Sequence, residues 1–492
     1  MTPRFDTDVQ ELKYKVLKEV AALALNDVLT PENTLSIADK IIPDGAKPTM
    51  RCCIYKERAI INQRVKLALG GNLRNPNVVE VLPIACDECP VDGITVTQAC
   101  RGCIAHNCIN VCPKGAITIV NRRATVDKDK CIECGRCAQV CSYGAILKLE
   151  RPCEKACRVK AISMNPETQK ASITLDKCVS CGACVYQCPF GAISDKSFIT
   201  KAIDLVKHSF GNRNYHTYAV VAPSIGAQYA DIKAEQVYEG LLKLGFYRVE
   251  EAAWGADAVA YYEAEELVKE GFLTSSCCPA FVSLVQKNYP DLADKVSQNP
   301  SPMAMMALNI RRRDPTAEIV FIGPCIAKKY ETLYTRTKNA VSCAITFEEM
   351  QAWFDAAGVD LGDLEGVSLT NSSSFGRGFA RCGGLADAVA EAIREMEGME
   401  DFDLQALSCN GLAECNAALL RKSKGALKEN FIEGMACVNG CIGGAGTVQL
   451  IPKAAQEVEK IKKASDKAHA YESGYSDLLS DLEENDGFKP GD

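Results

Sequence analysis

Histidine and long apolar stretches are scarce in this chain of 492 residues. Only four histidines are present, so few imidazole groups are available to bind a metal. No run of about eighteen apolar residues occurs, which argues against a membrane partner. The first residues have neither an apolar signal core nor a twin arginine, and we therefore expect a cytoplasmic protein. The net charge of -7 argues against a nucleic-acid partner, because nucleic acids bind basic surfaces.

Cysteine is abundant instead, with 27 residues. Because the cytosol keeps thiols reduced, metal ligation explains this number better than disulfides do. Residues 1–80 are predicted to be a helical N-terminal region, since apolar residues from Asp8 to Leu25 recur at helical spacing. The adjacent Cys52 and Cys53 are interpreted as small buried apolar residues, because adjacent thiols rarely bind one metal.

A short repeat follows the N-terminal region. In four places a cysteine is followed four residues later by Ala-Ile, which indicates duplicated structural units. The repeats form two pairs, and we predict two tandem α+β ferredoxin-like modules at residues 81–148 and 149–195. The four repeats begin at Cys112, Cys141, Cys157 and Cys188.

The cysteine spacing within these modules is typical of [4Fe-4S] clusters. Three cysteines at x2 spacing fit one cluster, and the fourth cysteine of each run binds the neighbouring cluster. The run from Cys100 to Cys112 is a looser version, with four residues between Cys103 and Cys108. Zinc is the alternative, since paired Cys-x-x-Cys motifs also bind zinc, but the repetition favours iron–sulfur. The first module then holds one cluster at Cys100, Cys103, Cys108 and Cys141, and another at Cys131, Cys134, Cys137 and Cys112.

The second module accounts for a third cluster in the same way. Its predicted ligands are Cys178, Cys181, Cys184 and Cys157. Two cysteines of this module then remain without a local Cys-x-x-Cys pair, and an upstream pair is available to complete a set of four. A fourth accessory cluster is therefore a hypothesis, with the ligands Cys86, Cys89, Cys153 and Cys188.

Strand-like and helix-like segments alternate over residues 196–455, which predicts an α/β domain. The expected strands are 218–223, 317–323 and 404–408, and the expected helices include 198–210 and 386–396. Residues 456–492 are expected to form a charged, solvated helix and a mobile tail.

Three short motifs in the α/β region resemble the active-site signatures of the [FeFe]-hydrogenase (iron-only hydrogenase) family. They are TSSCCP at 274–279, GPCIAKKYE at 323–331 and EGMACVNGCIGGAG at 433–446. The resemblance covers roughly residues 81–455 and implies an H-cluster, which is a [4Fe-4S] cubane joined to a diiron unit carrying CO, cyanide and an azadithiolate. It also implies that Cys441 bridges the two parts, and that the cubane ligands are Cys278, Cys325, Cys437 and Cys441.

The resemblance extends to residues around the diiron unit. Lys328 matches a lysine that contacts one cyanide, and a buried ammonium needs such an anion. Pro223 and Ser224 match a segment that contacts the other cyanide, and Met435 and Phe379 match residues packed near the irons. The glycines of the third motif are expected to let the backbone approach the inorganic core.

A proton relay is also implied by the family likeness. Cys277 matches the relay thiol, and Glu263, Ser297 and Glu266 match the groups that follow outward. Glu263 and Glu266 are spaced to share one helix face, which suits a chain of proton carriers. The alternative for the two glutamates is a solvated, charged helix face.

Some residues depart from the commonest family pattern and resemble the branch called group B. Gly323 stands where many members have methionine, and Met303 replaces a common glutamine. Cys382 is either a thiol beside the cluster or part of the core, and Cys343, Cys409 and Cys415 are interpreted as structural.

The sequence thus predicts an enzyme that interconverts protons, electrons and hydrogen. The expected partners are a soluble ferredoxin-type carrier, because no flavin or nicotinamide motif is present, and the hydrogenase maturation proteins. A hydrogen sensor and a non-catalytic iron–sulfur scaffold of the same family remain as alternatives, and the oligomeric state stays open.

Overall fold

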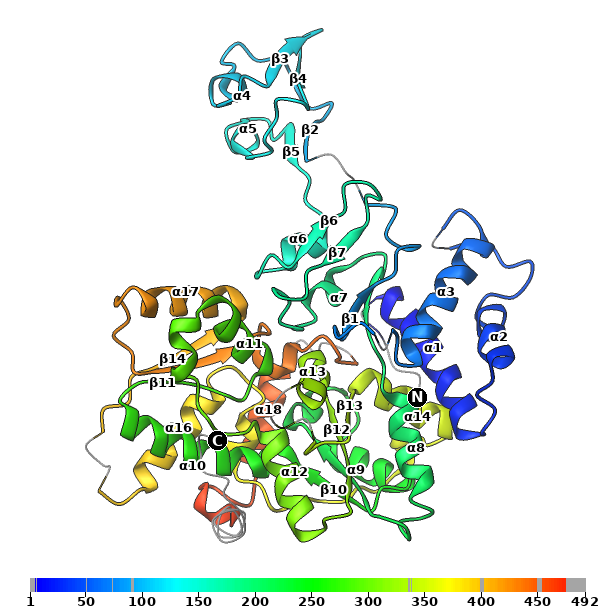
Figure 1. Cartoon of the computed structure of the whole chain (residues 1–492), viewed down its shortest axis with the longest axis vertical. Helices are drawn as coiled ribbons and strands as arrows, with labels where there is room; N and C mark the ends of the chain where they lie inside the picture. Colours follow the sequence, from blue (N-terminus) through cyan, green and yellow to red (C-terminus); the bar gives the residue numbers. More distant parts are fainter. Residues whose placement is uncertain are drawn as a thin grey trace.

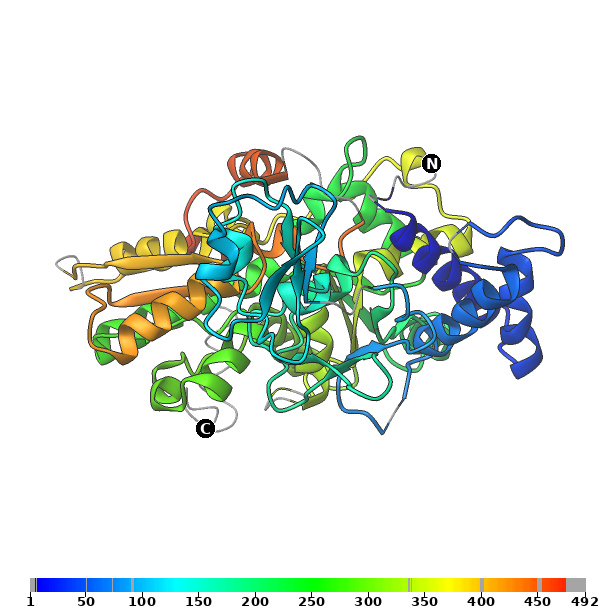
Figure 2. The same ribbon diagram turned by 90° about the horizontal axis from the view of Figure 1, so that it is seen from above.

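The computed structural model describes residues 5, 7–49, 51–72, 74–89, 93–334, 337, 339–398, 402–448 and 454–474. Figure 1 shows the first cysteine-rich module projecting from the molecule, the second module below it, and a large α/β body at the base. The N-terminal helices and the sheet that contains β14 lie on opposite sides of this body in both views (Figures 1 and 2). Within the described ranges, no helix is both long and apolar enough to cross a membrane.

The N-terminal region is helical, as predicted, and its first helix has the predicted bounds. Thr7 and Thr30 cap the first two helices by accepting backbone N–H groups through their hydroxyls. One apolar face of the first helix is buried against a helix of the α/β body. The three helices are α1 (Asp8–Leu25), α2 (Pro31–Ile41) and α3 (Ile54–Ala68).

The interpretation of the adjacent thiols as buried apolar residues is wrong for Cys52, which is exposed, while Cys53 is half-buried. The physical reason is their position: Cys53 is the N-cap of α3, so the pair lies in the loop before the helix instead of on its packed face.

Each cysteine-rich module is built from short antiparallel strand pairs and one-turn helices. In the first module β2 (Ile94–Val96) pairs with β5 (Ile146–Lys148), and β3 (Ile117–Val120) pairs with β4 (Arg123–Val126). The second module has the matching pairs β1 (Val79–Val81) with β8 (Ile193–Asp195), and β6 (Ile162–Met164) with β7 (Ala171–Ile173). The short helices are α4 (Asn107–Asn110), α5 (Arg136–Gln139), α6 (Pro152–Ala156) and α7 (Ala183–Gln187).

The expected division at residue 81 does not follow the packing. β1 pairs with β8, and Leu82, Ala85 and Cys86 pack in one cluster with Cys153 and Cys188. The segment before the first module therefore belongs structurally to the second module, which places the upstream cysteine pair beside the cysteines that lack a local partner motif.

The α/β body contains two parallel sheets, with strand orders β10-β9-β12-β13 and β11-β15-β14. Their central strands are buried on both faces, as expected for parallel sheets covered by helices. The predicted strands are present with shifts of one or two residues. The strands are β9 (Thr217–Val221), β10 (Arg248–Glu251), β11 (Leu273–Thr274), β12 (Glu318–Gly323), β13 (Cys343–Thr346), β14 (Ala406–Asn410) and β15 (Phe431–Met435).

Helices surround both sheets, and the predicted helices at 198–210 and 386–396 are present. The helices of this body are α8 (Ile199–His208), α9 (Ala234–Lys243), α10 (Ala252–Glu270), α11 (Pro279–Asn288), α12 (Pro302–Arg313), α13 (Ile326–Tyr334), α14 (Phe347–Ala357), α15 (Ser374–Gly378), α16 (Gly384–Glu395), α17 (Leu412–Ser423) and α18 (Ala454–Lys463).

A buried network of charges joins the second module to the body and to α1. Lys329 of α13 is fully buried and donates to Asp195 of β8 at 2.8 Å, and it pairs with Glu349 of α14 at 2.7 Å. Lys13 of α1 reaches Asp195 from the other side, at 2.7 Å. Burial opposes the charge of Asp195, but the two lysines lower its pKa below the ordinary value. Three parts of the chain are therefore held together at one point.

The expectation of a solvated C-terminal helix is wrong for one face of α18. Ala454 and Val458 are buried with Ala227, Ala380 and Ile442, because α18 has apolar residues at helical spacing toward the body. The predicted mobile tail lies outside the described residues.

Candidate active site

The four motif cysteines meet where strands of both parallel sheets end. Cys278 follows β11 and caps α11, while Cys325 lies between β12 and α13. Cys437 and Cys441 follow β15, the central strand of the second sheet. The carboxyl ends of parallel strands are the usual binding region of α/β folds, because loops there converge on one crevice. Residues far apart in the sequence are thus brought to one place.

A central cavity of about 80 Å³ lies at this point. Its wall is mainly apolar and includes Met303, Phe321, Phe379 and Met435, which are all buried. Pro223, the residue after β9 that the sequence singled out, also lines it. The cysteines in the wall are Cys277, Cys278, Cys325 and Cys441.

The thiols around the central cavity are poorly suited to exist as free thiolates. Burial raises the pKa of Cys325 to about 11 and that of Cys441 to about 12. Burial also raises the pKa of Cys437 well above its usual value, and the neighbouring Cys325, Cys278 and Cys441 add to this shift. Several buried sulfurs this close together become stable as anions when they share a cationic metal centre. The donor set therefore fits an iron–sulfur cubane.

Lys328 brings a buried positive charge to the cavity wall. Its ammonium donates to Glu331 at 2.7 Å and to the carbonyl of Cys277 at 3.3 Å. Burial opposes the charge of Lys328, but Glu331 and the Cys325 thiol raise its pKa above the ordinary value. Ser301 holds the other oxygen of Glu331 at 2.6 Å. An ammonium fixed in this way suits an anionic ligand in the cavity.

Ser224 follows the lining residue Pro223 and is completely buried. Its hydroxyl has no hydrogen-bond partner among the described residues, although buried hydroxyls are normally satisfied. An unpartnered buried donor beside the cavity fits the anionic, hydrogen-bond-accepting ligands that the family likeness implies.

The glycines of the third motif allow close approach of protein backbone. Gly440 has a φ of +68°, and a side chain there would meet the backbone of Ala380 and Cys382. A side chain at Gly444 would meet the carbonyl of Pro324 at 2.5 Å. Because these residues have no side chain, the loop that contains Cys437 and Cys441 packs closely against neighbouring backbone, and this packing positions both thiols.

The expected relay residues lie in two hydrogen-bonded groups. Glu263 is fully buried, which excludes the solvated-face alternative for this residue, and it accepts the backbone N–H and hydroxyl of Ser276 at 2.8 and 2.9 Å. Burial raises the pKa of Glu263 to about 8. Farther out, Ser297 donates to Glu266 at 2.7 Å. The thiol of Cys277 lies close enough to Glu263 for that carboxylate to raise its pKa further, after burial itself.

Three polar residues at the site were missed by the sequence reading. Ser276 binds Glu263, and Asn299 donates to both Ser297 and Glu266 at 3.0 Å. Glu433, the first residue of the third motif, is fully buried and accepts the hydroxyl of Ser408 at 2.8 Å and the N–H of Gly383 at 3.0 Å. Only Glu433 had a sequence signal, because it is an acidic residue at the start of a cysteine motif.

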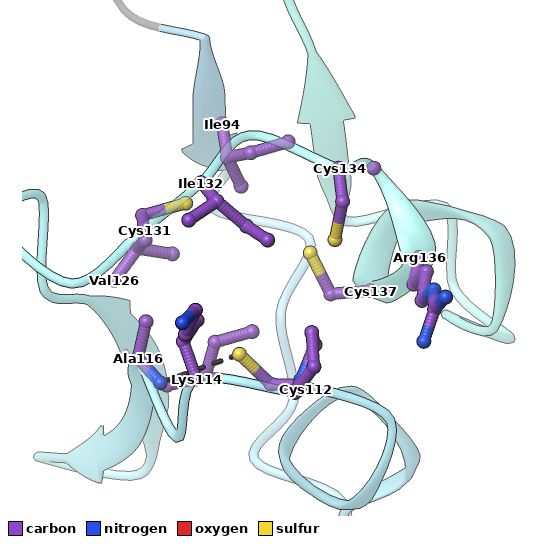
Figure 3. Close-up of a pocket in the computed structure, with 13 residues that line it drawn as sticks. Ile94, Cys112, Lys114, Ala116, Val126, Cys131, Ile132, Cys134, Arg136 and Cys137 are labelled. Carbon is purple, nitrogen blue, oxygen red and sulfur yellow. Dashed lines mark hydrogen bonds between the residues drawn. The ribbon is translucent and has the colours of Figure 1, made fainter.

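The cysteines of the first module form the two predicted sets. One cavity is lined by Cys100, Cys103, Cys108 and Cys141, and a second by Cys112, Cys131, Cys134 and Cys137. Figure 3 shows the four sulfurs of the second set directed into one space, with the N–H of Ala116 donating to Cys112 at 3.3 Å. In each set, three cysteines close in the sequence are therefore joined by a distant fourth, which is Cys141 in one set and Cys112 in the other.

The Ala-Ile repeat has a structural role in both modules. In each repeat the alanine N–H donates to the sulfur of the cysteine four residues earlier, at 3.1 to 3.3 Å. Such bonds stabilise negative charge on a ligating sulfur. The four donors are Ala116, Ala145, Ala161 and Ala192.

The hypothetical fourth set gains support from a further correspondence. Ala124 of β4 donates to Cys100 at 3.4 Å, and Ala171 of β7 donates to Cys86 at 3.3 Å. Cys86 therefore occupies the position in the second module that Cys100 occupies in the first. Burial raises the pKa of Cys153 to about 12, and Cys188, Cys86 and Cys89 lie close enough to add to this shift.

The second module reaches the central cavity directly. Cys181 and Cys437 influence each other's charge, as do Cys181 and Cys278. At Gly182 a side chain would clash with Ile326, which follows Cys325, and with Ala445 of the third motif. The third predicted set, Cys178, Cys181, Cys184 and Cys157, is therefore adjacent to the cavity cysteines.

Family comparison decides what this assembly is. The model of the iron-only hydrogenase large subunit, C-terminal domain, matches residues 215–445, and the 4Fe-4S dicluster domain matches residues 99–145 and 151–192. The α/β body belongs to the iron-only hydrogenase large-subunit family, and the two modules match the 4Fe-4S dicluster family.

Known members of the iron-only hydrogenases align with most of the chain. Iron hydrogenase 1 of Clostridium pasteurianum is 27% identical over 71% of this chain and 70% of its own length. The NADP-reducing hydrogenase subunit HndD of Solidesulfovibrio fructosivorans is 27% identical over 76% of this chain and 66% of its own length. Among solved structures, an [FeFe]-hydrogenase from Chlamydomonas reinhardtii is 20% identical, with a TM-score of 0.47, and covers 60% of this chain and 95% of its own.

At Gly323, where many iron-only hydrogenases have methionine, the ring of Phe321 occupies the space that a side chain would need. A side chain at this position would meet the ring of Phe321 at 2.7 Å and Ala222 at 3.0 Å. The Phe321 ring lines the central cavity, so it fills the space beside Gly323. Met303, the second departure, lines the same cavity. Both positions therefore affect the apolar part of the cavity wall and not its cysteines.

Proposed function

We propose that this chain is an [FeFe]-hydrogenase that catalyses the reversible reaction of two protons and two electrons to hydrogen at an H-cluster. The observation that carries the proposal is the convergence of Cys278, Cys325, Cys437 and Cys441 beside a cavity whose wall holds Lys328. When bound, the H-cluster supplies the redox chemistry, and its assembly requires the hydrogenase maturation proteins.

The protein's own residues would bind and orient the cofactor. Cys278, Cys325, Cys437 and Cys441 would hold the cubane, and the Lys328 ammonium and the Ser224 hydroxyl would be the donors for its cyanide ligands. The apolar wall formed by residues such as Met435 and Phe379 excludes water, which strengthens these electrostatic contacts.

Protons would move through the interior along titratable side chains. Cys277 stands at the cavity wall, and the carboxyl of Glu263 is protonated at neutral pH because its pKa is raised to about 8. Ser297 and Glu266 continue the path toward the half-buried end of α10. Exchange between Glu263 and Ser297 would need a small movement or a water molecule, because no direct hydrogen bond joins them.

Electrons would enter through the two modules from a ferredoxin-type carrier. We assign [4Fe-4S] clusters to the sets around Cys100, Cys131 and Cys178, and a fourth to Cys86, Cys89, Cys153 and Cys188. The correspondence between Cys86 and Cys100 supports this fourth cluster. The second module lies between the projecting first module and the α/β body (Figure 1), and its set around Cys181 adjoins the cavity cysteines.

The test is isotope exchange between deuterium gas and water, followed by mass spectrometry. Protein produced together with the maturation proteins should form HD, and the same chain produced without them should not. Exchange needs no carrier, so it reports on the central cavity alone. Matured chain with a full iron complement but no exchange would favour the scaffold alternative. Exchange accompanied by negligible turnover with every carrier would favour the sensor.

A further inference from the structure

A buried arginine contacts a sulfur of the fourth set, whose cysteines are Cys86, Cys89, Cys153 and Cys188. Arg151, the N-cap of α6, is 5% exposed, and its guanidinium donates to the Cys86 sulfur at 3.7 Å. The same guanidinium donates to the carbonyl of Gln169 at 3.0 Å. Arg151 opposes the rise that burial causes in the pKa of Glu154, but no carboxylate of the described residues forms an ion pair with it. Its positive charge is therefore directed at a ligand sulfur.

A second buried arginine lies beside the last cysteine of this set. Arg64 of α3 is 5% exposed and donates at 2.7 Å to the carbonyl of Gly191, which lies shortly after Cys188. Burial lowers the pKa of Arg64 to about 10, and the charge of Cys188 opposes this shift. Within the described ranges Arg64 has no ion-pair partner, and its Nε has no hydrogen-bond acceptor. Arg51 lies near the same set, but the carboxylate of Asp87 is 4.0 Å from it.

Arg64 and Arg151 differ from the other buried cations of the described residues. Each of the others has a carboxylate partner within 3.2 Å, and they are Lys196, Lys328 and Lys329. The cations in the cavity walls of the first module are exposed, so water and salt screen their charge, and they are Arg101, Lys114 and Arg136. In the part of the chain that the structure describes, buried positive charge without a carboxylate is thus found at the fourth set.

Two buried guanidiniums without carboxylates need another anion. Burial of an unpaired charge is strongly unfavourable, and proteins normally satisfy it with a counterion. Four thiolates around a [4Fe-4S] core carry a net negative charge, and one-electron reduction of the core adds a further negative charge. A cluster at the fourth set would therefore supply the anion that Arg64 and Arg151 lack.

The two arginines stabilise the reduced form of such a cluster more than its oxidised form. Burial by itself lowers the reduction potential, because it disfavours added negative charge. The attraction between the cluster and a cation is strongest in the same buried surroundings, and two uncompensated cations outweigh this effect. The thiols Cys181 and Cys184 of the third set are shifted mainly by burial and by neighbouring thiols instead.

The fourth set lies close to the sets on either side of it. Cys153 adds to the rise in the pKa of Cys184, so the fourth set adjoins the third. Glu133, which lies between two ligands of a first-module set, adds to the rise in the pKa of Glu154, the residue after Cys153. An electron held at the fourth set is therefore near both modules' other clusters.

We propose that Arg64 and Arg151 raise the reduction potential of the cluster at the fourth set above that of every other accessory cluster, so that this cluster accepts and holds one electron before the others. The proposal rests on the proposed function for the presence of that cluster. In the storage step the oxidised core gains one electron from a reduced neighbouring cluster, which is oxidised in turn. The store holds one of the two electrons that each hydrogen molecule requires or releases.

The test is a redox titration of the full chain with its accessory clusters, followed by electron paramagnetic resonance. As the potential is lowered, the first signal of a reduced cluster should come from the fourth set. Cys86→Ala combined with Cys89→Ala should therefore remove this first signal and lower the iron content by one cluster per chain. Persistence of the first signal in the double variant would overturn the proposal.

Removal of one buried charge should shift the midpoint of the first signal. Arg64→Gln should weaken the reduction equilibrium about tenfold, which lowers the midpoint by about 59 mV for one electron. Arg64→Lys keeps the charge and should restore most of the shift. Arg151→Gln should also lower the midpoint, but it removes a contact to a ligand sulfur, so Arg64→Gln is the deciding variant.

Arg158→Gln is the matched control, since Arg158 is an exposed arginine next to Cys157, and it should titrate like the parent chain. An unchanged midpoint in Arg64→Gln, or an equal shift in Arg158→Gln, would overturn the proposal. If the midpoints follow the expectation but the matured chain shows no deuterium exchange, the proposed function fails at the central cavity and the role of the two arginines stands. If the chain exchanges deuterium but lacks a fourth cluster, this proposal fails and the catalytic proposal stands.

Discussion

The first module and the central cavity use the same ligand, cysteine, in opposite surroundings. In the module Cys103 and Cys134 are exposed, and the two cavities are lined in part by Arg101, Lys114 and Arg136. Around the central cavity, burial raises the pKa of Cys325, Cys437 and Cys441, and the charged groups are held by buried partners. The difference teaches that one ligand type can serve two environments: a surface module with cationic side chains, and a buried cavity with an apolar wall.

Removal of one cysteine from each region should separate their roles most strongly. Cys437→Ala removes a proposed cubane ligand and should abolish deuterium exchange, whereas Cys103→Ala removes an outer ligand and should keep exchange while ferredoxin-linked hydrogen production is lost. Exchange and carrier-linked turnover of both variants are measured by mass spectrometry and gas chromatography. Cys343→Ala, a buried cysteine of β13, is the control and should retain both activities. Loss of exchange in Cys103→Ala would break the comparison.

The buried carboxyl group of Glu263 should affect proton transfer at the central cavity and not electron transfer through the modules. Glu263→Gln removes a proton-carrying group beside Cys277 and should lower hydrogen production about 10²–10⁴-fold, the usual contribution of a positioned acid or base. Glu265→Gln is the matched control, because Glu265 is an exposed glutamate on the same helix. Electron paramagnetic resonance should show reduction of the accessory clusters at the parent rate in both variants. Equal turnover of the two variants would remove Glu263 from the proton path.

The sequence anticipated the parts of this comparison that local spacing constrains. Closely spaced cysteine triplets fold as tight loops, so the repeat predicted that Cys112 and Cys141 pair with remote triplets, and both pairings are present. Strands buried on both faces, such as β9 and β12, were visible as apolar runs. The resemblance of the three motifs to one family's active-site signatures predicted that the cavity cysteines lie together.

Features that depend on distant partners could not be predicted in this way. No local pattern shows that Ser276 binds Glu263, that Lys329 meets Asp195 and Glu349, or that β1 pairs with β8. The exposure of Cys52 was misjudged because two adjacent cysteines give no periodic signal from which burial can be inferred.

The second module differs from the first in being anchored by buried charge. Lys329→Met leaves Asp195 and Glu349 buried beside each other without this cation, and breaking a buried ion pair costs about 3–5 kcal/mol. We therefore expect a clear fall in the denaturant midpoint, followed by circular dichroism. Lys243→Met removes an exposed ion pair and should change stability by about 0.5 kcal/mol or less. Similar midpoints for the two variants would contradict the anchoring role.

A smaller effect should appear in the pH dependence of stability. Glu263 has a folded pKa of about 8 against an ordinary value of 4.5, so the folded chain keeps a proton that the unfolded chain loses between these values. Its contribution to stability therefore falls as the pH rises through this window. Glu263→Gln should flatten the decline in the unfolding midpoint between pH 5 and pH 8, relative to Glu265→Gln. An identical pH profile for both variants would show that Glu263 is already ionised at neutral pH.

The most direct measurement of the central claim is infrared spectroscopy of the matured chain. If Cys278, Cys325, Cys437 and Cys441 hold a cubane joined to a diiron unit, the spectrum contains stretching bands of bound carbon monoxide and cyanide, and Cys441→Ala removes them. Matured protein that carries its accessory clusters but shows no such bands would contradict the assignment of the central cavity.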